Sequence, residues 1–169
     1  MCHEVLRSER AEVGRTTFFR HFGDKQEVVF AREQELLDTI AAGQAEDTAA
    51  PRNATEAVEQ LRPILLALCA QATADPEAYT LHFQLISQHP ELRARDAIKT
   101  QQIGDKLSDL LIHRGSDEAT ARLAGQVALA CYQTAKLLGN NPHTLVAETQ
   151  AAFRQVLTLG PGTSGRQSR

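Results

Sequence analysis

Apolar residues recur along this chain at the three- and four-residue spacing that is typical of amphipathic α-helices. The spacing is clearest between residues 53 and 72, where one apolar stripe consists of Ala57, Leu61, Ile64, Leu65, Leu68, Cys69 and Ala72. No segment alternates with period two as a half-buried strand would, and no internal repeat is visible. The pattern therefore predicts an all-α fold.

Capping residues, prolines and glycines divide this pattern into helices. The predicted helices cover about residues 24–46, 53–72, 76–87, 90–113, 117–138 and 142–159. Pro63 lies inside the second of them and, because proline lacks a backbone N–H, it is expected to kink or divide that helix. Gly115 and Gly139 are expected to end two helices, and Asn141-Pro142 is expected to start the last one.

Composition limits the classes of protein to consider. The net charge of −3 gives no overall attraction to nucleic acid or to anionic membranes, so any basic site must be local. Cys2, Cys69 and Cys131 lack metal-ligand spacing and are interpreted as reduced thiols. Apolar runs are too short to cross a membrane, and no signal-peptide pattern is present. These features predict a cytoplasmic protein that binds no membrane and needs no cofactor.

The segment GRTTFFRHFGDKQEVVF, residues 14–30, places three of the six phenylalanines of the chain within five positions, 18–22. A short helix over about 14–22 and a turn would place Phe18 and Phe22 on one face. The outward positions carry basic and polar side chains: Arg15, Thr16, Thr17, Arg20 and His21. This arrangement suits a helix that lies in a DNA groove, and Lys25 falls in the next first turn, which favours a phosphate.

The longer segment AEVGRTTFFRHFGDKQEVVF resembles the end of the helix-turn-helix domain of the tetracycline-repressor (TetR) family. The family motif runs roughly Ala-Gly-Val-Ser-x-Gly-Thr-Phe-Tyr-x-x-Phe-x-x-Lys. The positions that match in register are Ala11, Val13, Thr17, Phe18, Phe22 and Lys25. Phe19 stands where the family usually has Tyr, and Gly14 where it usually has Ser. PELRAR at 90–95 and the last two helices are similar more weakly, so the resemblance covers about residues 11–159.

The resemblance implies a ligand-responsive transcriptional regulator, usually a repressor, that binds double-stranded operator DNA as a homodimer. It assigns Arg15 and Thr16 to base edges, and Thr17, His21 and Lys25 to phosphates. Phe19 could touch a thymine methyl group. The implied organisation is a DNA-binding head at 1–46, and a ligand-binding and dimerisation domain at 53–159. Residues 160–169, GPGTSGRQSR, contain no bulky apolar residue and are expected to form a disordered tail.

The head departs from the family pattern before the motif. The positions four and three residues before Ala11 hold Arg7 and Ser8, where the family offers apolar side chains to the core. Residues 1–25 carry five basic against four acidic side chains, a net charge of +1. The head is therefore predicted to be truncated, and an alternative function stays open, that of a headless effector-binding and dimerisation protein that does not itself bind DNA. No catalytic motif of an enzyme is present.

The resemblance also implies a cavity for a small effector within the helices of residues 54–138. The candidate lining residues are Leu65, Leu68, Cys69, His82, Phe83, Ile86, Ile103, Leu107 and Tyr132, with Gln84 and Gln102 as further polar candidates. For each apolar member taken singly, such a position is more typical of ordinary core than of a ligand site. His82 and His89 could share a helix face, but no third ligand lies nearby in the sequence, so no metal site is expected.

The last two predicted helices carry apolar residues on more than one side, which suits a four-helix dimer interface. The candidate interface residues are Leu123, Val127, Cys131, Leu138, Leu145, Phe153 and Val156. Small residues between them would allow the helices of two subunits to approach closely; these are Ala124, Gly125, Ala128 and Ala135. The alternative is a fully buried helical hairpin in a monomer.

Overall fold

The computed structural model describes residues 48–159, which are all-α and contain no strand, as predicted. The helices are α2 (Ala54–Ala72), α3 (Pro76–Gln88), α4 (Pro90–His113), α5 (Glu118–Leu137) and α6 (Leu145–Thr158). The predicted recognition helix at 14–22, the connecting helix at 24–46 and the tail at 160–169 lie outside the described residues.

Side-chain caps begin three of the helices where the sequence predicts them. Asn53 Oδ1 accepts the backbone N–H of Glu56 at 2.9 Å, and Asp75 Oδ1 accepts that of Ala78 at 3.0 Å. Asp117 Oδ1 accepts the N–H of Thr120 at 2.9 Å in the same way. Each carboxylate or amide satisfies a first-turn donor that has no partner inside its helix. These local signals therefore set the starts of α2, α3 and α5.

Two helix boundaries differ from the predictions. Pro63 was expected to kink or divide its helix, and the division is wrong, because α2 runs through it from Ala54 to Ala72. The last helix begins at Leu145 rather than at residue 142, because Asn141 Oδ1 accepts the N–H of His143 at 2.9 Å. This side-chain bond offers the backbone a turn in place of a helix. The preceding Asn140 is left-handed, with φ of 50°, which also separates the connection from α6.

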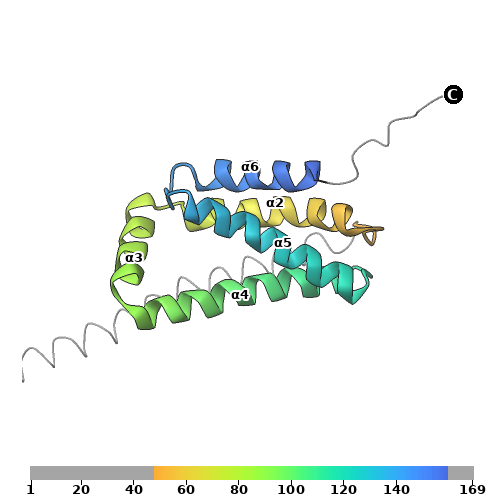
Figure 1. The fold of residues 1–169 in the computed structure, drawn as a ribbon, viewed down its shortest axis with the longest axis horizontal. Helices are drawn as coiled ribbons and strands as arrows, with labels where there is room; N and C mark the ends of the chain where they lie inside the picture. Colours follow the sequence, from red (N-terminus) through yellow and green to blue (C-terminus); the bar gives the residue numbers. More distant parts are fainter. Residues whose placement is uncertain (1–47, 160–169) are drawn as a thin grey trace, which may run out of the picture.

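The helices pack around α5, which contacts α2, α4 and α6. In Figure 1, α2 and α6 lie side by side, α4 runs along the opposite edge, and α5 crosses obliquely between them. The core cluster takes its largest side chains from α2, α4 and α6, among them Leu61, Ile64, Leu65, Leu107, Leu111 and Phe153. Helix α5 contributes mainly alanines to this cluster, so its neighbours can come close to it.

Helices α4 and α5 cross at a pair of glycines, Gly104 and Gly125. A Cβ atom on Gly125 would lie 2.8 Å from the backbone oxygen of Gly104 and closer still to Ser108 Oγ. Ser108 is fully buried and donates its hydroxyl to the Gly104 oxygen at 2.9 Å. The small residues of α5 thus permit close packing within one chain. Their predicted role between two subunits is wrong for this face, since Ala124, Ala128 and Ala135 are fully buried.

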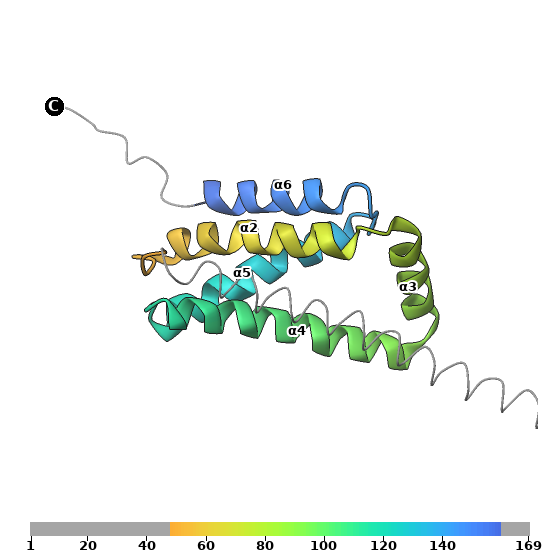
Figure 2. The same cartoon turned by 180° about the vertical axis from the view of Figure 1, so that it is seen from behind.

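Helix α3 stands across one end of the bundle and links α2 to α4, as both views show (Figures 1 and 2). It is buried at only two positions, Tyr79 and Ile86. Because α3 lies across the end instead of along the bundle, it does not fill the space between the last turns of α2 and the first half of α4.

Candidate ligand-binding cavity

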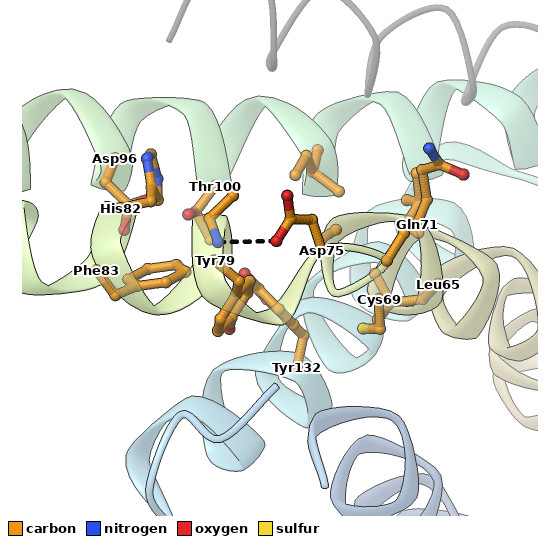
Figure 3. Close-up of a pocket in the computed structure, with 15 residues that line it drawn as sticks. Leu65, Cys69, Gln71, Asp75, Tyr79, His82, Phe83, Asp96, Thr100 and Tyr132 are labelled. Carbon is orange, nitrogen blue, oxygen red and sulfur yellow. Dashed lines mark hydrogen bonds between the residues drawn. The ribbon is translucent and has the colours of Figure 1, made fainter. Parts of the chain in front are cut away.

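A cavity of about 330 Å³ occupies that space, enclosed by α2, α3, α4 and Tyr132 of α5 (Figure 3). Its wall is largely apolar and aromatic, with a few polar groups. The lining residues are Leu65, Leu68, Cys69, Gln71, Ala72, Ala74, Asp75, Ala78, Tyr79, His82, Phe83, Asp96, Thr100, Ile103 and Tyr132. Small-molecule sites commonly have this volume and this mixture of side chains.

Seven of the nine residues that the sequence assigned to an effector cavity line this one: Leu65, Leu68, Cys69, His82, Phe83, Ile103 and Tyr132. The other two do not. Leu107 is fully buried in the main core, and Ile86 is buried elsewhere on α3. Gln84 and Gln102 are exposed and lie outside the lining.

Five polar lining residues were not among the predicted ones: Gln71, Asp75, Tyr79, Asp96 and Thr100. Asp75 had been interpreted only as the cap of α3, a role that it also fills. Asp96 and Thr100 are four residues apart on α4, so helical spacing could have put them on one face, but nothing local shows that this face meets a cavity.

Aromatic rings on α3 form one wall of the cavity. The Tyr79 and Phe83 ring centroids are 4.7 Å apart, and the His82 ring meets Phe83 edge-on at 5.0 Å. The Tyr79 hydroxyl donates to Asn140 Oδ1 at 2.5 Å, in the connection between α5 and α6. This bond ties α3 to the connection between α5 and α6 at the same end of the bundle, and it holds the wall in place.

A largely buried ion pair joins α4 to α5 beside this wall. Lys136 Nζ lies 3.0 Å from Asp96 Oδ2, and the two side chains are only 18% and 17% exposed. The same ammonium lies 4.4 Å from the Phe83 ring centroid and 5.5 Å from that of Tyr132. The ammonium is thus bound by one carboxylate and two aromatic faces. The two charged residues are 40 positions apart, so the sequence pattern gave no sign of their pairing.

His82 has an electrostatic environment that favours its neutral form. Burial lowers the pKa of its imidazole below the ordinary value, and the charges of Lys136 and Lys99 act in the same direction, whereas Asp96 opposes them. The imidazole therefore presents one donor and one acceptor nitrogen, and no positive charge, to the cavity at neutral pH.

We expect this histidine to make the fold less stable in mild acid. The unfolded imidazole takes up a proton at about pH 6.5, and the folded one only at lower pH, so protonation favours unfolding. Neutral His82 should contribute fully to the free energy of unfolding above about pH 7. That free energy should fall as the pH drops through 6.5, by at most about 1.4 kcal/mol per pH unit. Urea unfolding at pH 7.5 and 5.5 measures it.

His82→Gln should reduce that pH dependence, whereas His143→Gln, at an exposed histidine between α5 and α6, should leave it unchanged. An equal effect of the two substitutions would show that burial at His82 is not the cause.

Cys69 and Cys131 are buried thiols outside any disulfide, as predicted; Cys2 lies outside the described residues. Cys69 lines the cavity, and its Sγ lies 3.8 Å from Thr149 Oγ1 of α6. Burial raises the pKa of the Cys131 thiol, which keeps it protonated and unreactive.

The predicted dimer-interface residues separate into two groups. Cys131, Leu145 and Phe153 are buried inside the chain, so their assignment to a subunit interface is wrong. Val127 and Val156 are partly buried against the core. Leu123 and Leu138 are 55% and 69% exposed and remain available to a partner, as do Leu137 and Leu159.

The predicted DNA-contacting residues all precede residue 48 and lie outside the described part: Arg15, Thr16, Thr17, Phe19, His21 and Lys25. Within residues 48–159, no three His, Cys, Asp or Glu side chains gather as a metal ion would require. None of the helices in this range has the length and apolar character needed to cross a bilayer.

Comparisons of the chain with protein-family models, with curated proteins and with solved structures found no match.

Proposed function

We propose that this chain is a ligand-responsive transcriptional regulator that binds operator DNA as a dimer and acts as a repressor. The observation that carries the proposal is the cavity between α2, α3, α4 and α5, which lies in the segment where the resemblance to the TetR family implies an effector site. A concave, mostly apolar cavity with a few polar groups is the usual form of a small-molecule site. The motif at residues 14–30 supplies the DNA-reading part of the proposal.

The cavity is placed where a ligand can change how helices pack. It contacts the last turns of α2 and the first half of α4, and α2 follows the segment that carries the motif. A ligand alters DNA affinity only if it binds one arrangement of the two heads more tightly than the other. A molecule seated between α2 and α4 would have such a preference if the two arrangements differ in their spacing.

The dimer would form through the outer side of α5 and α6. Four exposed leucines mark the ends and outer face of these helices: Leu123, Leu137, Leu138 and Leu159. Two helices from each of two chains would form a four-helix bundle that covers these side chains. This exposed apolar set is smaller and more peripheral than the sequence pattern suggested, because the other apolar faces of α5 and α6 pack in the core of the chain.

The proposal predicts sequence-specific DNA binding that depends on the motif. In a mobility-shift assay with DNA flanking its own coding sequence, the full chain should give a shifted band that unlabelled specific DNA removes. Arg15→Ala should abolish specific binding and Lys25→Ala should weaken it, because each loses a base-edge or phosphate contact. Arg154→Ala removes the same charge from the exposed face of α6 and serves as the matched control.

A second candidate function is favoured by Arg7 and Ser8. Polar residues at these positions would leave Phe18 and Phe22 with less apolar partner surface in the head. The chain would then bind ligand and dimerise without binding DNA. Equal retention of DNA by Arg15→Ala and Arg154→Ala, or no specific shift at all, would favour this second function over the first.

A further inference from the structure

We infer that the cavity binds an organic cation: a compact molecule with an apolar or aromatic body and one amine or quaternary ammonium head. The inference deepens the proposed function, since it rests on the cavity being a ligand site and adds the chemical class of the ligand.

The charged groups that line the cavity favour a positive ligand. The lining contains two acidic side chains, Asp75 and Asp96, and no lysine or arginine is among the lining residues. Asp75 is exposed, whereas Asp96 is only 17% exposed and lies beside His82 of the aromatic wall (Figure 3). An anionic ligand would approach the Asp75 carboxylate, and it could not take the place of the Lys136 ammonium beside Asp96, because like charges at such short range repel each other.

The protein already holds an ammonium group at this wall. Lys136 Nζ contacts Asp96, Phe83 and Tyr132, and all three of these residues line the cavity although Lys136 does not. A carboxylate together with aromatic faces is the arrangement by which proteins bind ammonium ligands. Lys136 therefore shows that these three side chains can bind a cation in their present positions.

A ligand ammonium would replace that of Lys136. Lysine has a flexible four-carbon stem, and Lys136 lies in the last turn of α5 with its side chain 18% exposed, so its head can move to water. The exchange keeps Asp96 paired throughout. It also removes the direct ionic link between α4 and α5, which gives the ligand a means to alter the packing of these helices.

The rest of the cavity suits the apolar body of such a molecule. Leu65, Leu68, Ala72 and Ile103 are apolar members of the lining, and all four belong to the two core clusters or pack against them. A volume of about 330 Å³ is near the lower end of the range for drug-sized sites, so the body should be compact.

The test compares three heads on one body. The full chain is titrated calorimetrically at neutral pH with 4-phenylbutylamine, 4-phenylbutanol and 4-phenylbutanoate. We expect the amine to bind about tenfold or more tightly than the alcohol, and the carboxylate to bind most weakly. Asp96→Asn should weaken amine binding about tenfold and leave alcohol binding unchanged. Lys136→Met should strengthen amine binding about tenfold, because it removes the competing ammonium.

Either single substitution leaves one charge without its partner and could disturb the fold. The double variant Asp96→Asn/Lys136→Met leaves neither charge, and should bind the amine and the alcohol with similar affinities. Alcohol and amine affinities that are equal in the native chain would overturn the inference. So would tightest binding by the carboxylate, particularly if Lys136→Met abolished it.

Failure of this inference and failure of the proposed function can be told apart. Binding of the alcohol or the carboxylate in preference to the amine overturns only the cationic class. If none of the three compounds binds, the inference that this cavity is the ligand site is overturned. Amine binding by a chain that shifts no DNA supports the inference and contradicts the regulator.

Discussion

Phe153→Ala is expected to lower the free energy of unfolding by about 3–5 kcal/mol, the usual range for removing a large aromatic side chain from a core. Phe153 lies on α6, is fully buried, and belongs to the same core cluster as Leu61 and Leu65 of α2. Its loss would leave a void at the contact between α6 and the rest of the bundle. Urea unfolding followed by circular dichroism, at several protein concentrations, measures the change.

The concentrations matter because the sequence pattern had placed Phe153 between subunits. Burial within one chain predicts a loss of stability that is similar at every concentration. Leu137→Ala provides the control: this leucine is 87% exposed, so a monomer should lose less than about 0.5 kcal/mol. If Phe153→Ala weakened dimer association but left the stability of the monomer unchanged, intrachain burial of Phe153 would be wrong.

Most of the helical framework could be predicted from sequence because its signals are local. Asn53, Asp75 and Asp117 each accept a first-turn N–H within three residues, and Gly115 takes the left-handed φ of 92° that ends α4. The start of α6 was missed although its signal is also local. Asn141 both resembles a helix cap and forms a turn, and only the conformation of the neighbouring residue decides between the two.

The cavity was predictable only in part, because periodicity identifies the inner face of a helix but not what that face meets. Leu65 and Leu107 have similar surroundings in the sequence, yet Leu65 borders the cavity while Leu107 lies wholly within the core. The difference comes from α3, which crosses the end of the bundle. Asp96 and Lys136 were missed since charged residues on helices are usually exposed, and only tertiary packing brings these two together.

The assignment of α5 and α6 to a dimer interface failed for a related reason. A helix with apolar residues on several sides can be central in one chain or shared between two, and the sequence pattern is the same for both. Here α5 is central, contacting α2, α4 and α6. Its many small side chains are explained by close packing against these neighbours, and what remains for a partner is the exposed set around Leu123 and Leu137.

Gly125→Ala tests this close packing, and we expect it to lower the free energy of unfolding by about 2–3 kcal/mol. Alanine improves intrinsic helix propensity by about 1 kcal/mol over glycine, so on an exposed face the same change would stabilise. At Gly125 the added Cβ would meet the Gly104 backbone oxygen at 2.8 Å, and backbone cannot rotate away as a side chain can. Over-packing should therefore outweigh propensity. Thermal and urea unfolding measure the difference.

Two further variants identify the atom that causes the loss. Ser108→Ala removes the hydroxyl oxygen nearest to the added Cβ, but the Gly104 oxygen remains, so in the Gly125→Ala background it should restore only part of the stability. Gln133→Ala, at an exposed position of the same helix, should change stability by less than about 0.5 kcal/mol. Full recovery with Ser108→Ala would show that the hydroxyl alone limits the approach. A Gly125→Ala chain as stable as the native one would mean that α4 and α5 do not cross this closely, and the position of Asp96 beside Lys136, which depends on that crossing, would then need revision.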